Sequence, residues 1–480
     1  MNLIKNGLLN IKNYKEMNET IIALATASGS GAIAIIRISG KDAISIADSV
    51  FKAHSGRSLA NSDSHTVHLG YFFDYGTVID ECLATIFKGN RSYTGEPTVE
   101  FSCHGSSYII QQVIKVCLAK GCRLAKAGEF TLRAFLNGKI DLSQAEAVAD
   151  LIASDSEASH AIAMKQMRGG FTSEIEELRA ELLNFASLIE LELDFSEEDV
   201  EFADRNQFRT LLSKIQKAIK RLMDSFATGN VIKNGVPVAI VGKPNAGKST
   251  LLNALLNEER AIVSDIAGTT RDTIEEVLHI GGTAFRFIDT AGIRETSDKI
   301  EEIGVKKAKE KIAQANVLLY LYDELDNHPQ EVIDFVKEVY REDLKIILLH
   351  NKVDVSSGEF GEFDQKLKSE LVPKYTDIIL GISAKENINI DILKSELATY
   401  AESFTSSANN IIISNSRHYE ALSNALTEII KVQEGLEMNL SGDLLAIDIR
   451  EALYHLGTIS GEVTNDEVLG NIFANFCIGK

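Results

Sequence analysis

The sequence predicts a multidomain protein of the α/β class, in which a parallel sheet is covered by helices on both faces. The chain has 480 residues, which is more than one hydrophobic core usually supports. Short apolar stretches alternate with helical segments at 236–241, 285–288, 317–322, 346–350 and 378–382, and this alternation is typical of a parallel sheet. Helical patterns with an apolar stripe lie before and after that region.

The composition is that of a globular protein with an excess of acidic residues. Hydrophobic residues make up 45% and charged residues 25%, and no apolar run reaches the ~20 residues that a membrane-spanning helix needs. The net charge of −20 argues against a protein that coats nucleic acid, because each phosphate contact needs a local cation. An RNA substrate would need a partner protein or a small local basic surface to hold it.

The N-terminus and the cysteines predict a cytoplasmic protein. Residues 1–16 lack a continuous apolar core and a cleavage site, so we expect a disordered leader, or an upstream start codon ahead of Met17. The cysteines are odd in number and form no CxxC pair, which fits a reducing cytosol. They are Cys82, Cys103, Cys117, Cys122 and Cys477.

Two different patterns precede the α/β zone. The zone at 17–134 mixes strand patterns with turns and predicts an α+β domain. Its expected elements are strands at 21–25, 31–38, 83–88 and 99–103 and a helix at 108–120. The zone at 135–230 predicts helices, one of them introduced by a capping box of Ser143 and Glu146. A longer helix is expected after Gly170, with an apolar face formed by Ile175, Leu178, Leu182, Phe185, Ile189 and Leu193.

Helical periodicity returns after the α/β zone at 231–400. The segment 401–480 carries another apolar stripe, formed by Leu422, Leu426, Ile429, Leu436 and Leu440. We expect the helices of 135–230 and 401–480 to pack together. The α/β module would then be an insertion within one helical domain.

A phosphate-binding loop is predicted at 242–249. Its sequence, GKPNAGKS, fits G-x-x-x-x-G-K-[ST] and lies between an apolar strand and a helix. Glycines let the backbone N–H groups of such a loop point at phosphate oxygens, and the helix behind it adds positive potential. Lys248 would bridge the β- and γ-phosphates, and Ser249 would ligate Mg²⁺.

Further motifs follow in the order of a guanine nucleotide site. In GTTRD at 268–272, Thr270 would give Mg²⁺ a second hydroxyl, and in DTAG at 289–292, Asp289 would act on the metal through water. In NKVD at 351–354, Asp354 can accept two hydrogen bonds from guanine, which adenine cannot reproduce. The nucleotide is therefore predicted to be GTP. Its expected contacts are Asn245, Ala246, Gly247, Lys248, Ser249, Thr250, Ser264, Asp265, Ile266, Ala267, Gly268, Thr269, Thr270, Asp289, Thr290, Ala291, Gly292, Asn351, Lys352, Asp354, Ser383, Ala384 and Lys385.

One position departs from the Ras-like pattern within the translation-factor-related GTPases. Ras-like members have a glutamine after DTAG that orients the attacking water, and here that position is Ile293. An isoleucine cannot hydrogen-bond water, so another group must do this, or hydrolysis is very slow. The candidates just downstream are Arg294, Glu295, Glu301 and Glu302.

Along nearly its full length the chain resembles the MnmE (TrmE) family. The motifs that carry the resemblance are IRISG at 36–40, SYTGE at 92–96, GEFT at 128–131, FLNGK at 135–139 and the C-terminal FCIGK at 476–480. It implies an N-terminal tetrahydrofolate-binding and dimerisation domain at 17–134. It further implies a discontinuous helical domain at 135–230 and 401–480, with an inserted Ras-like P-loop GTPase domain at 231–400.

The resemblance also implies how hydrolysis is activated. Members of the family respond to potassium and to dimerisation of their GTPase domains, and the ion takes the place of an arginine finger. The matching potassium ligands are Asn245, Ser264, Ile266 and Thr269, and Glu301 matches the carboxylate that organises the catalytic water. The expected catalytic residues are Glu301, Asn245, Lys248 and Thr270.

A folate site is implied by the same resemblance. Arg37, Glu100, Lys139 and Lys480 match the contacts to a tetrahydrofolate derivative, the 5-formyl or 5,10-methylene form. A carboxylate suits the pterin, and cations attract the glutamate tail. A catalytic role for Cys477 is a further hypothesis, although a thiol near a terminus is more often structural.

The implied reaction involves partners. The resemblance implies a homodimer that works with the FAD-containing MnmG (GidA) subunit to add a (carboxymethyl)aminomethyl group to C5 of the wobble uridine of tRNA. The acidic chain would leave most of the tRNA binding to the partner.

One alternative is a GTPase of ribosome assembly without folate chemistry, which the N-terminal motifs and FCIGK oppose. In another alternative folate chemistry is the main activity and GTP is structural, which the complete switch motifs oppose.

Overall fold

The computed structural model describes most of the chain. The described residues are 18–194, 204–257, 276–288, 309–324, 327–355, 361–376, 378–405 and 412–464, with Leu469, Ile472, Phe473, Phe476 and Gly479. The predicted leader at 1–16 lies outside them. The chain divides into two compact units, and each is described by itself. The first comprises residues 1–152, 165–219 and 420–480, and the second comprises 153–164 and 220–419.

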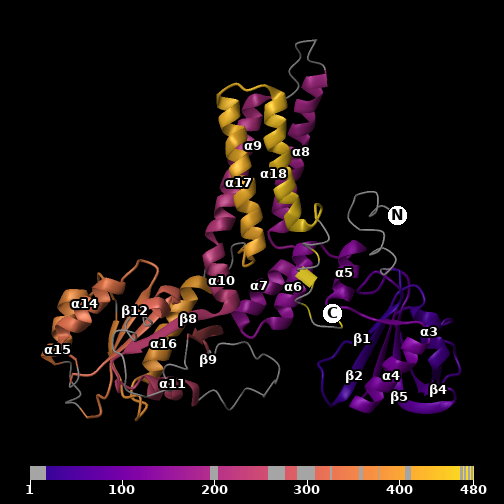
Figure 1. The fold of residues 1–480 in the computed structure, drawn as a ribbon, viewed down its shortest axis with the longest axis horizontal. Coiled ribbons are helices and arrows are strands. Elements are labelled where there is room, and N and C mark those ends of the chain that lie inside the picture. The colour runs from indigo at the N-terminus through magenta and orange to yellow at the C-terminus, as the bar shows by residue number, and fades with distance from the viewer. Residues whose placement is uncertain are drawn as a thin grey trace. The chain divides into compact units, whose positions relative to one another are not determined.

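A seven-stranded sheet forms the N-terminal part of the first unit (Figure 1). Its strand order is β3-β4-β5-β6-β2-β1-β7. The strands are β1 (Ile21–Leu24), β2 (Gly31–Ser39), β3 (Phe51–Ala53), β4 (Thr66–Asp74), β5 (Thr77–Phe87), β6 (Thr98–Gly105) and β7 (Arg123–Leu124). Every pair is antiparallel except β1 with β7. The predicted α+β architecture is therefore present.

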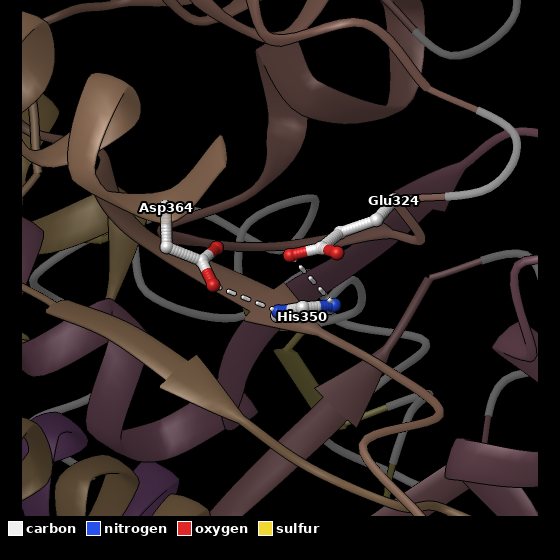
Figure 2. A group of neighbouring side chains, drawn as sticks. All are labelled: Glu324, His350 and Asp364. Atoms are coloured by element: carbon white, nitrogen blue, oxygen red, sulfur yellow. Dashed lines mark hydrogen bonds and ion pairs between the residues drawn. The ribbon is translucent and has the colours of Figure 1, made fainter. Parts of the chain in front are cut away.

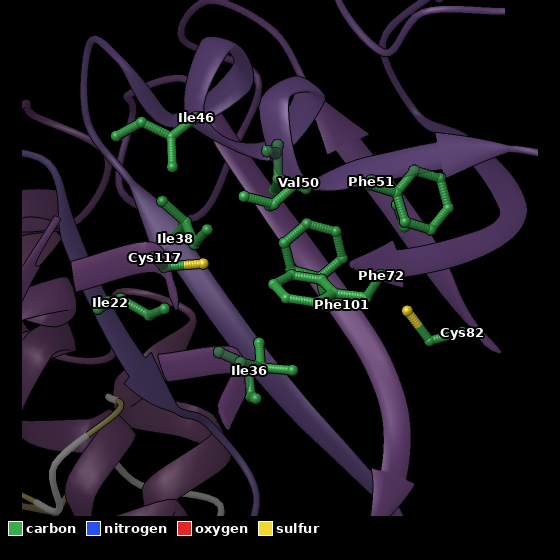
Figure 3. Close-up of a cluster of buried hydrophobic side chains, with 14 of the residues drawn as sticks. Ile22, Ile36, Ile38, Ile46, Val50, Phe51, Phe72, Cys82, Phe101 and Cys117 are labelled. Atoms are coloured by element: carbon green, nitrogen blue, oxygen red, sulfur yellow. The ribbon is translucent and has the colours of Figure 1, made fainter. Parts of the chain in front are cut away.

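Two helices cover one face of this sheet. They are α3 (Ala43–Val50) and α4 (Ser107–Ala119), and their apolar sides meet the strands in one buried cluster (Figure 3). Aromatic rings fill the cluster, with the Phe72 and Phe101 rings edge to face at a centroid separation of 5.1 Å. Such pairs add to the stabilisation that comes from burying apolar area.

The expected strands at 21–25, 31–38 and 99–103 and the helix at 108–120 match β1, β2, β6 and α4, but other elements were missed. Strand β5 is longer than the expected 83–88, and α3, β3 and β4 were not predicted. The reason is visible in β4, where Phe72 is buried while Val67, Leu69 and Tyr71 are exposed. Because both faces carry apolar residues, the period of two that marks a half-buried strand is lost.

The rest of the first unit is helical. It contains α5 (Glu129–Leu136), α6 (Leu142–Ala153), α8 (Thr172–Asp194), α9 (Arg205–Asp224), α17 (Ser416–Glu437) and α18 (Gly442–Ser460). Helix α7 (Glu157–Met167) begins in the second unit and enters the first at Lys165. Helices α8, α9, α17 and α18 run side by side (Figure 1). Arg179 Nε on α8 donates to Leu453 O on α18 at 3.3 Å, and Gln216 Nε2 on α9 donates to Gln433 Oε1 on α17 at 2.5 Å. Helices from both sides of the insertion therefore pack together, as predicted.

Two helical predictions need correction. The capping box of α6 is formed by Asp141 and Gln144, whose side chains each accept the other's backbone N–H at 2.8 and 2.9 Å. Ser143 and Glu146 were expected there, but both lie within the helix, because Asp141 competes successfully for the cap two residues earlier. Leu440 is 43% exposed, since α17 ends at Glu437 before the stripe reaches it.

A six-stranded sheet forms the centre of the second unit. Its order is β13-β12-β11-β8-β10-β9, and every pair is parallel except β9 with β10. The strands are β8 (Val236–Gly242), β9 (Glu276–Ile280), β10 (Thr283–Phe287), β11 (Val317–Tyr322), β12 (Lys345–His350) and β13 (Ile378–Gly381). All five predicted strands are present, and the antiparallel edge strand β9 is additional.

Helices cover both faces of this sheet. Helices α11 (Lys248–Asn257) and α16 (Ile390–Thr405) contribute to the buried cluster on one face, and α14 (Pro329–Val339) and α15 (Glu362–Leu371) contribute to that on the other. A further helix, α10 (Phe226–Asn234), leads into β8. The predicted α/β class is confirmed. Within the described residues, no helix combines the length and apolarity required to cross a bilayer.

Candidate functional site

The phosphate loop connects β8 to α11 in the second unit. Strand β8 ends at Gly242 and α11 begins at Lys248, so the loop residues lie at the carboxyl edge of the sheet and lead into a helix N-terminus. Asn245 and Gly247 have φ angles of 62° and 98°, in the left-handed region. This turn makes a concave backbone of the kind that binds phosphate oxygens.

Lys248 is folded over its own loop. Its Nζ donates to Gly242 O at 2.7 Å and to Lys243 O at 2.8 Å. Burial lowers the pKa of the Lys248 amine, and the nearby charge of Lys311 lowers it further. A nearby phosphate would raise the pKa of Lys248 against both effects, because an anion stabilises the charged amine.

Asn351 joins three parts of the site. Its Nδ2 donates to Ala246 O in the phosphate loop at 2.7 Å, and its Oδ1 accepts the N–H of Ala384 at 3.1 Å. A Cβ added at Gly247 would lie 2.2 Å from Asn351 Nδ2, so glycine is required for this approach. The predicted phosphate and guanine motifs are thus brought together by one buried amide.

The side chains expected at the base lie around this junction. Lys352 has a φ of 67° and its Nζ pairs with Asp323 Oδ2 at 2.5 Å. Asp354 is exposed, so its carboxylate is accessible to a ligand. Ser383 is fully buried, whereas the Lys385 side chain is 80% exposed.

Several expected site residues fall on parts of the chain that the structure does not describe. Ser249 and Thr250 are described, in the first turn of α11. The residues outside the described ranges are Ser264, Asp265, Ile266, Ala267, Gly268, Thr269, Thr270, Asp289, Thr290, Ala291, Gly292, Glu301, Cys477 and Lys480.

A buried polar network lies directly behind the guanine motif (Figure 2). His350, the last residue of β12, places Nδ1 2.9 Å from Asp364 Oδ2 on α15, and the Tyr322 hydroxyl donates to the other oxygen of Asp364. Glu324 Oε1 lies 3.9 Å from His350 Nε2. The side chains of Glu324, His350 and Asp364 are close enough to surround a cation. Because both Asp364 oxygens already accept hydrogen bonds, we interpret the cluster as a structural network.

A second cluster lies on the sheet of the first unit. Arg37 on β2 and Glu100 on β6 are cross-strand partners, and Arg37 Nε donates to Glu100 Oε1 at 2.7 Å. The rings of Tyr93 and Phe130 each lie 5.5 Å from the Arg37 guanidinium. A cation, a carboxylate and two rings are therefore gathered at one place, which suits a flat ligand with a charged tail.

Lys139 and the C-terminal tail approach the same region. Lys139 Nζ donates to Asn90 O at 3.0 Å, in the loop that also carries Tyr93. Gly479 in the FCIGK motif packs against β1, where an added Cβ would lie 2.1 Å from Leu24 O. The structure thus connects three separate sequence signatures through one loop and one strand.

Sequence reasoning missed the buried arginine that holds this loop. Arg133 is fully buried and donates to Glu96 Oε2 and Glu129 Oε1, both at 3.0 Å. Burial opposes the charged form of Glu129, but Arg123, the Lys126 N–H and Arg133 outweigh it and lower the pKa. The feature of the sequence that could have indicated this arginine is the acidic residue in each of two motifs, Glu96 in SYTGE and Glu129 in GEFT, since two carboxylates need a cation between them.

The second unit has the fold of a P-loop GTPase, and the first carries a separate cluster of charged and aromatic side chains around Arg37. The family model of the MnmE helical domain matches residues 142–477, and that of the GTP-binding protein TrmE N-terminus matches residues 20–139. The chain belongs to the MnmE (TrmE) family of tRNA modification GTPases. As a member it is a GTP hydrolase that takes part in tRNA modification and binds GTP with Mg²⁺.

Individual relatives match over almost their whole length. The tRNA modification GTPase MnmE of Flavobacterium johnsoniae is 61% identical over 468 residues, which cover 96% of this chain and 99% of that protein. The protein of that name from Christiangramia forsetii is 59% identical, with 97% and 100% covered. The one from Bacteroides fragilis is 53% identical, with 96% and 99% covered.

We predict that Gly247→Ala weakens GTP binding about 100-fold. A left-handed residue with a Cβ costs ~1–2 kcal/mol, and an unpaired Asn351 amide costs a further ~1–3 kcal/mol. Titration with a fluorescent GTP analogue measures the change. The control is Gly76→Ala, because Gly76 has a similar φ of 89° but open space at its Cβ position. Equal affinity of both variants and the wild type would contradict the prediction.

The His350 network predicts a pH dependence of stability. Burial lowers the pKa of His350, but Asp364, Glu324 and Asp323 outweigh it, so the folded pKa is raised. The resulting stabilisation is complete below the unfolded pKa of ~6.5 and is lost as pH rises through the folded value. Burial and Asp364 raise the pKa of Tyr322, which therefore remains a donor.

The matching variant is His350→Gln, which removes the titrating group. We expect it to cost about 1–3 kcal/mol at low pH, since Asp364 loses a buried donor. Thermal unfolding followed from acidic to alkaline pH should show the gap between wild type and variant narrowing as pH rises. A gap that stays constant, or that widens, would be inconsistent with a protonated His350 in the folded protein.

Proposed function

We propose that this protein is a potassium-activated GTPase that acts with an FAD-containing partner on the wobble uridine of tRNA. Together they would add a (carboxymethyl)aminomethyl group to C5, with a tetrahydrofolate derivative supplying a one-carbon unit. The single observation that carries the proposal is the match to MnmE proteins, which extends over the N-terminal, helical and GTPase segments alike. We place the activity in the cytoplasm, where the four described cysteines, all free and buried, would stay reduced.

The chain's own residues suit the GTP step. Lys248 would leave its loop carbonyls to hold the β- and γ-phosphates, while Ser249 and Thr270 would ligate Mg²⁺. Asp354 would accept hydrogen bonds from guanine. Asn351 would hold the phosphate loop, through Ala246, and the loop at Ala384 in fixed positions. Bound Mg²⁺ neutralises the charge that develops on the phosphates.

Potassium would supply the positive charge that an arginine finger provides in other GTPases. Asn245 is exposed at the rim of the phosphate loop with a φ of 62°, so its amide is available to a cation beside the phosphates. We propose Ser264, Ile266 and Thr269 as the other ligands. Glu301 would orient the water that attacks the γ-phosphate.

The folate proposal rests on the cluster at Arg37. Glu100 would pair with the pterin, while Arg37, Lys139 and Lys480 would attract the glutamate tail. The ring of Tyr93 is partly exposed beside Arg37 and offers a flat surface for the pterin, while Phe130 lies buried beneath and supports the guanidinium. Cys477 lies in the same tail motif as Lys480, and its thiol is proposed as a further catalytic group.

We also propose a homodimer that forms through the N-terminal domain at 17–134. The face of the sheet opposite α3 and α4 exposes a row of apolar side chains on β4 and β5. The row consists of Val67, Leu69, Tyr71 and Leu83. Rows of this kind on an uncovered sheet face are typical of protein interfaces. The helical domain at 135–230 and 401–480 and the GTPase domain at 231–400 complete the proposed boundaries.

A ribosome-assembly GTPase without folate chemistry is the alternative function. It would share the nucleotide site but would have no use for the Arg37–Glu100 cluster or the tail that packs on β1. The following two measurements separate the proposals.

We predict that GTP turnover is faster in KCl than in NaCl at equal ionic strength. The gain should exceed about tenfold, since a charge in the position of an arginine finger is worth roughly 10³–10⁵ in rate. Asn245→Ala should remove the gain, while Asn234→Ala, at the end of α10, should keep it. Equal rates in both salts would leave a GTPase but reject potassium activation.

We predict that Arg37→Ala weakens binding of 5-formyltetrahydrofolate by about tenfold or more, because a charge-assisted bond worth ~1.5–3 kcal/mol is lost. Calorimetric titration measures the affinity. The control is Arg57→Ala, since Arg57 is an exposed arginine of the same domain. GTP turnover should stay the same in both variants. Undiminished folate binding by Arg37→Ala would remove this residue from the site.

A further inference from the structure

Helix α9 is a basic element in an acidic chain. The whole chain has 49 Lys and Arg against 69 Asp and Glu. Within α9 (Arg205–Asp224) the only acidic residue is the last one, Asp224. The cations of the helix are Arg205, Arg209, Lys214, Lys217, Lys220 and Arg221. The acidity of the rest of the chain does not explain a helix of the opposite charge, so the basic residues of α9 need an explanation of their own.

The helix is anchored by its opposite face. The buried residues lie on one side and are Phe208, Leu211, Leu212, Ile215, Ala218, Ile219 and Leu222. With 3.6 residues per turn, Arg209, Lys217 and Lys220 fall within an arc of about 80° on the other side. All three are exposed. We name these three residues the basic stripe, which runs for about 16 Å along the helix.

The basic stripe differs from the other cations of α9 in its contacts. Lys214 is turned to α8, where its Nζ lies 2.8 Å from Glu181 Oε1, and Glu177 and Glu174 are also near. Arg209 contacts Asn206 Oδ1 on its own helix at 3.4 Å. Lys217 and Lys220 make no ion pair with any of the described residues. The stripe is thus charge that the described part of the fold does not neutralise.

We infer that the basic stripe of α9 is a contact surface for the phosphate backbone of tRNA. This inference rests on the proposed function and adds the place where the chain itself holds its RNA. The cations match phosphates, and the exposed side chains of Asn206 and Ser213 between them can donate to phosphate and sugar oxygens. The one aromatic residue of α9, Phe208, is buried, so no ring is offered for base stacking.

The contact would therefore depend on the shape of the RNA backbone and would fix the position of the RNA, without distinguishing one base from another. Phosphate contacts fix the register of a nucleic acid but carry no sequence information. The stripe would orient a folded RNA, while selection of the uridine falls to the catalytic centre and the partner. A second copy of this acidic protein could also meet the stripe, as could an anionic membrane, and the experiment below includes both outcomes.

The test replaces the stripe with Arg209→Gln, Lys217→Gln and Lys220→Gln in the full-length protein. The matched control is Lys366→Gln, Lys368→Gln and Lys374→Gln, which removes the same charge from exposed lysines of the second unit. Fluorescence anisotropy with labelled tRNA, over a series of salt concentrations, gives the affinity and its salt dependence. Circular dichroism and GTP turnover verify that both variants are folded and active.

We expect the stripe variant to bind tRNA about tenfold more weakly or worse at low salt. Its slope of log K against log salt should be shallower by about 2–3, since each lost phosphate contact removes about 0.7–0.9. The control should match the wild type. Equal affinity and slope in all three proteins would overturn the inference.

Other outcomes would overturn it differently. If the stripe variant loses only its binding to phosphatidylglycerol vesicles, the surface is for membranes. If it changes only the oligomeric state in size-exclusion chromatography, the surface is for a second copy. If the wild type binds no tRNA but modifies it when the partner is added, the stripe inference fails while the proposed function stands. If modification is absent as well, the proposed function fails.

Discussion

The side-chain amide of Asn351 is the contact on which the proposed nucleotide site depends. It spans 105 residues of sequence to hold Ala246 O, and it reaches forward to the N–H of Ala384. A phosphate loop and a base-binding loop are individually simple turns, and neither determines where the other lies. The amide fixes both, and it does so in a buried position where an unmade hydrogen bond is costly. This explains why Gly247 must lack a side chain, since a Cβ would occupy the space that the amide needs.

The same logic separates what the sequence could predict from what it could not. The loop at 242–249 and the strands of the second unit are local patterns, and the five predicted strands are all present. The contacts that assemble the sites are not local. The pair of Arg133 and Glu129 is local to α5, but nothing near Arg133 in the sequence indicates that it also holds Glu96, because that contact exists only once α5 packs on the sheet. The capping box at α6 was misplaced by two residues for a related reason, since Asp141 and Ser143 are both good caps and their geometry decides between them.

Charge acts in this protein at two scales. The net charge of −20 describes the whole chain and argues against extensive RNA binding. Interactions between exposed charges fade beyond the Debye length of ~8 Å at physiological salt, so a local surface can behave differently from the average. Helix α9 is such a place because its apolar face packs into the helical bundle while its charged face remains outside. An acidic protein can therefore repel nucleic acid in general and still position one RNA.

The inserted module imposes a last constraint, because the chain must leave the helical domain and return to it. An insertion is tolerated when its two ends lie close together. Here the two connections pack directly on each other within the second unit. The Ile413 N–H donates to Ser225 Oγ at 3.1 Å, and the rings of Phe226 and Tyr419 lie 4.7 Å apart. Gly229 on α10 has no room for a side chain beside Ile413 O. Since the outgoing and returning segments are held as a pair, a change that moves α10 must move both of them.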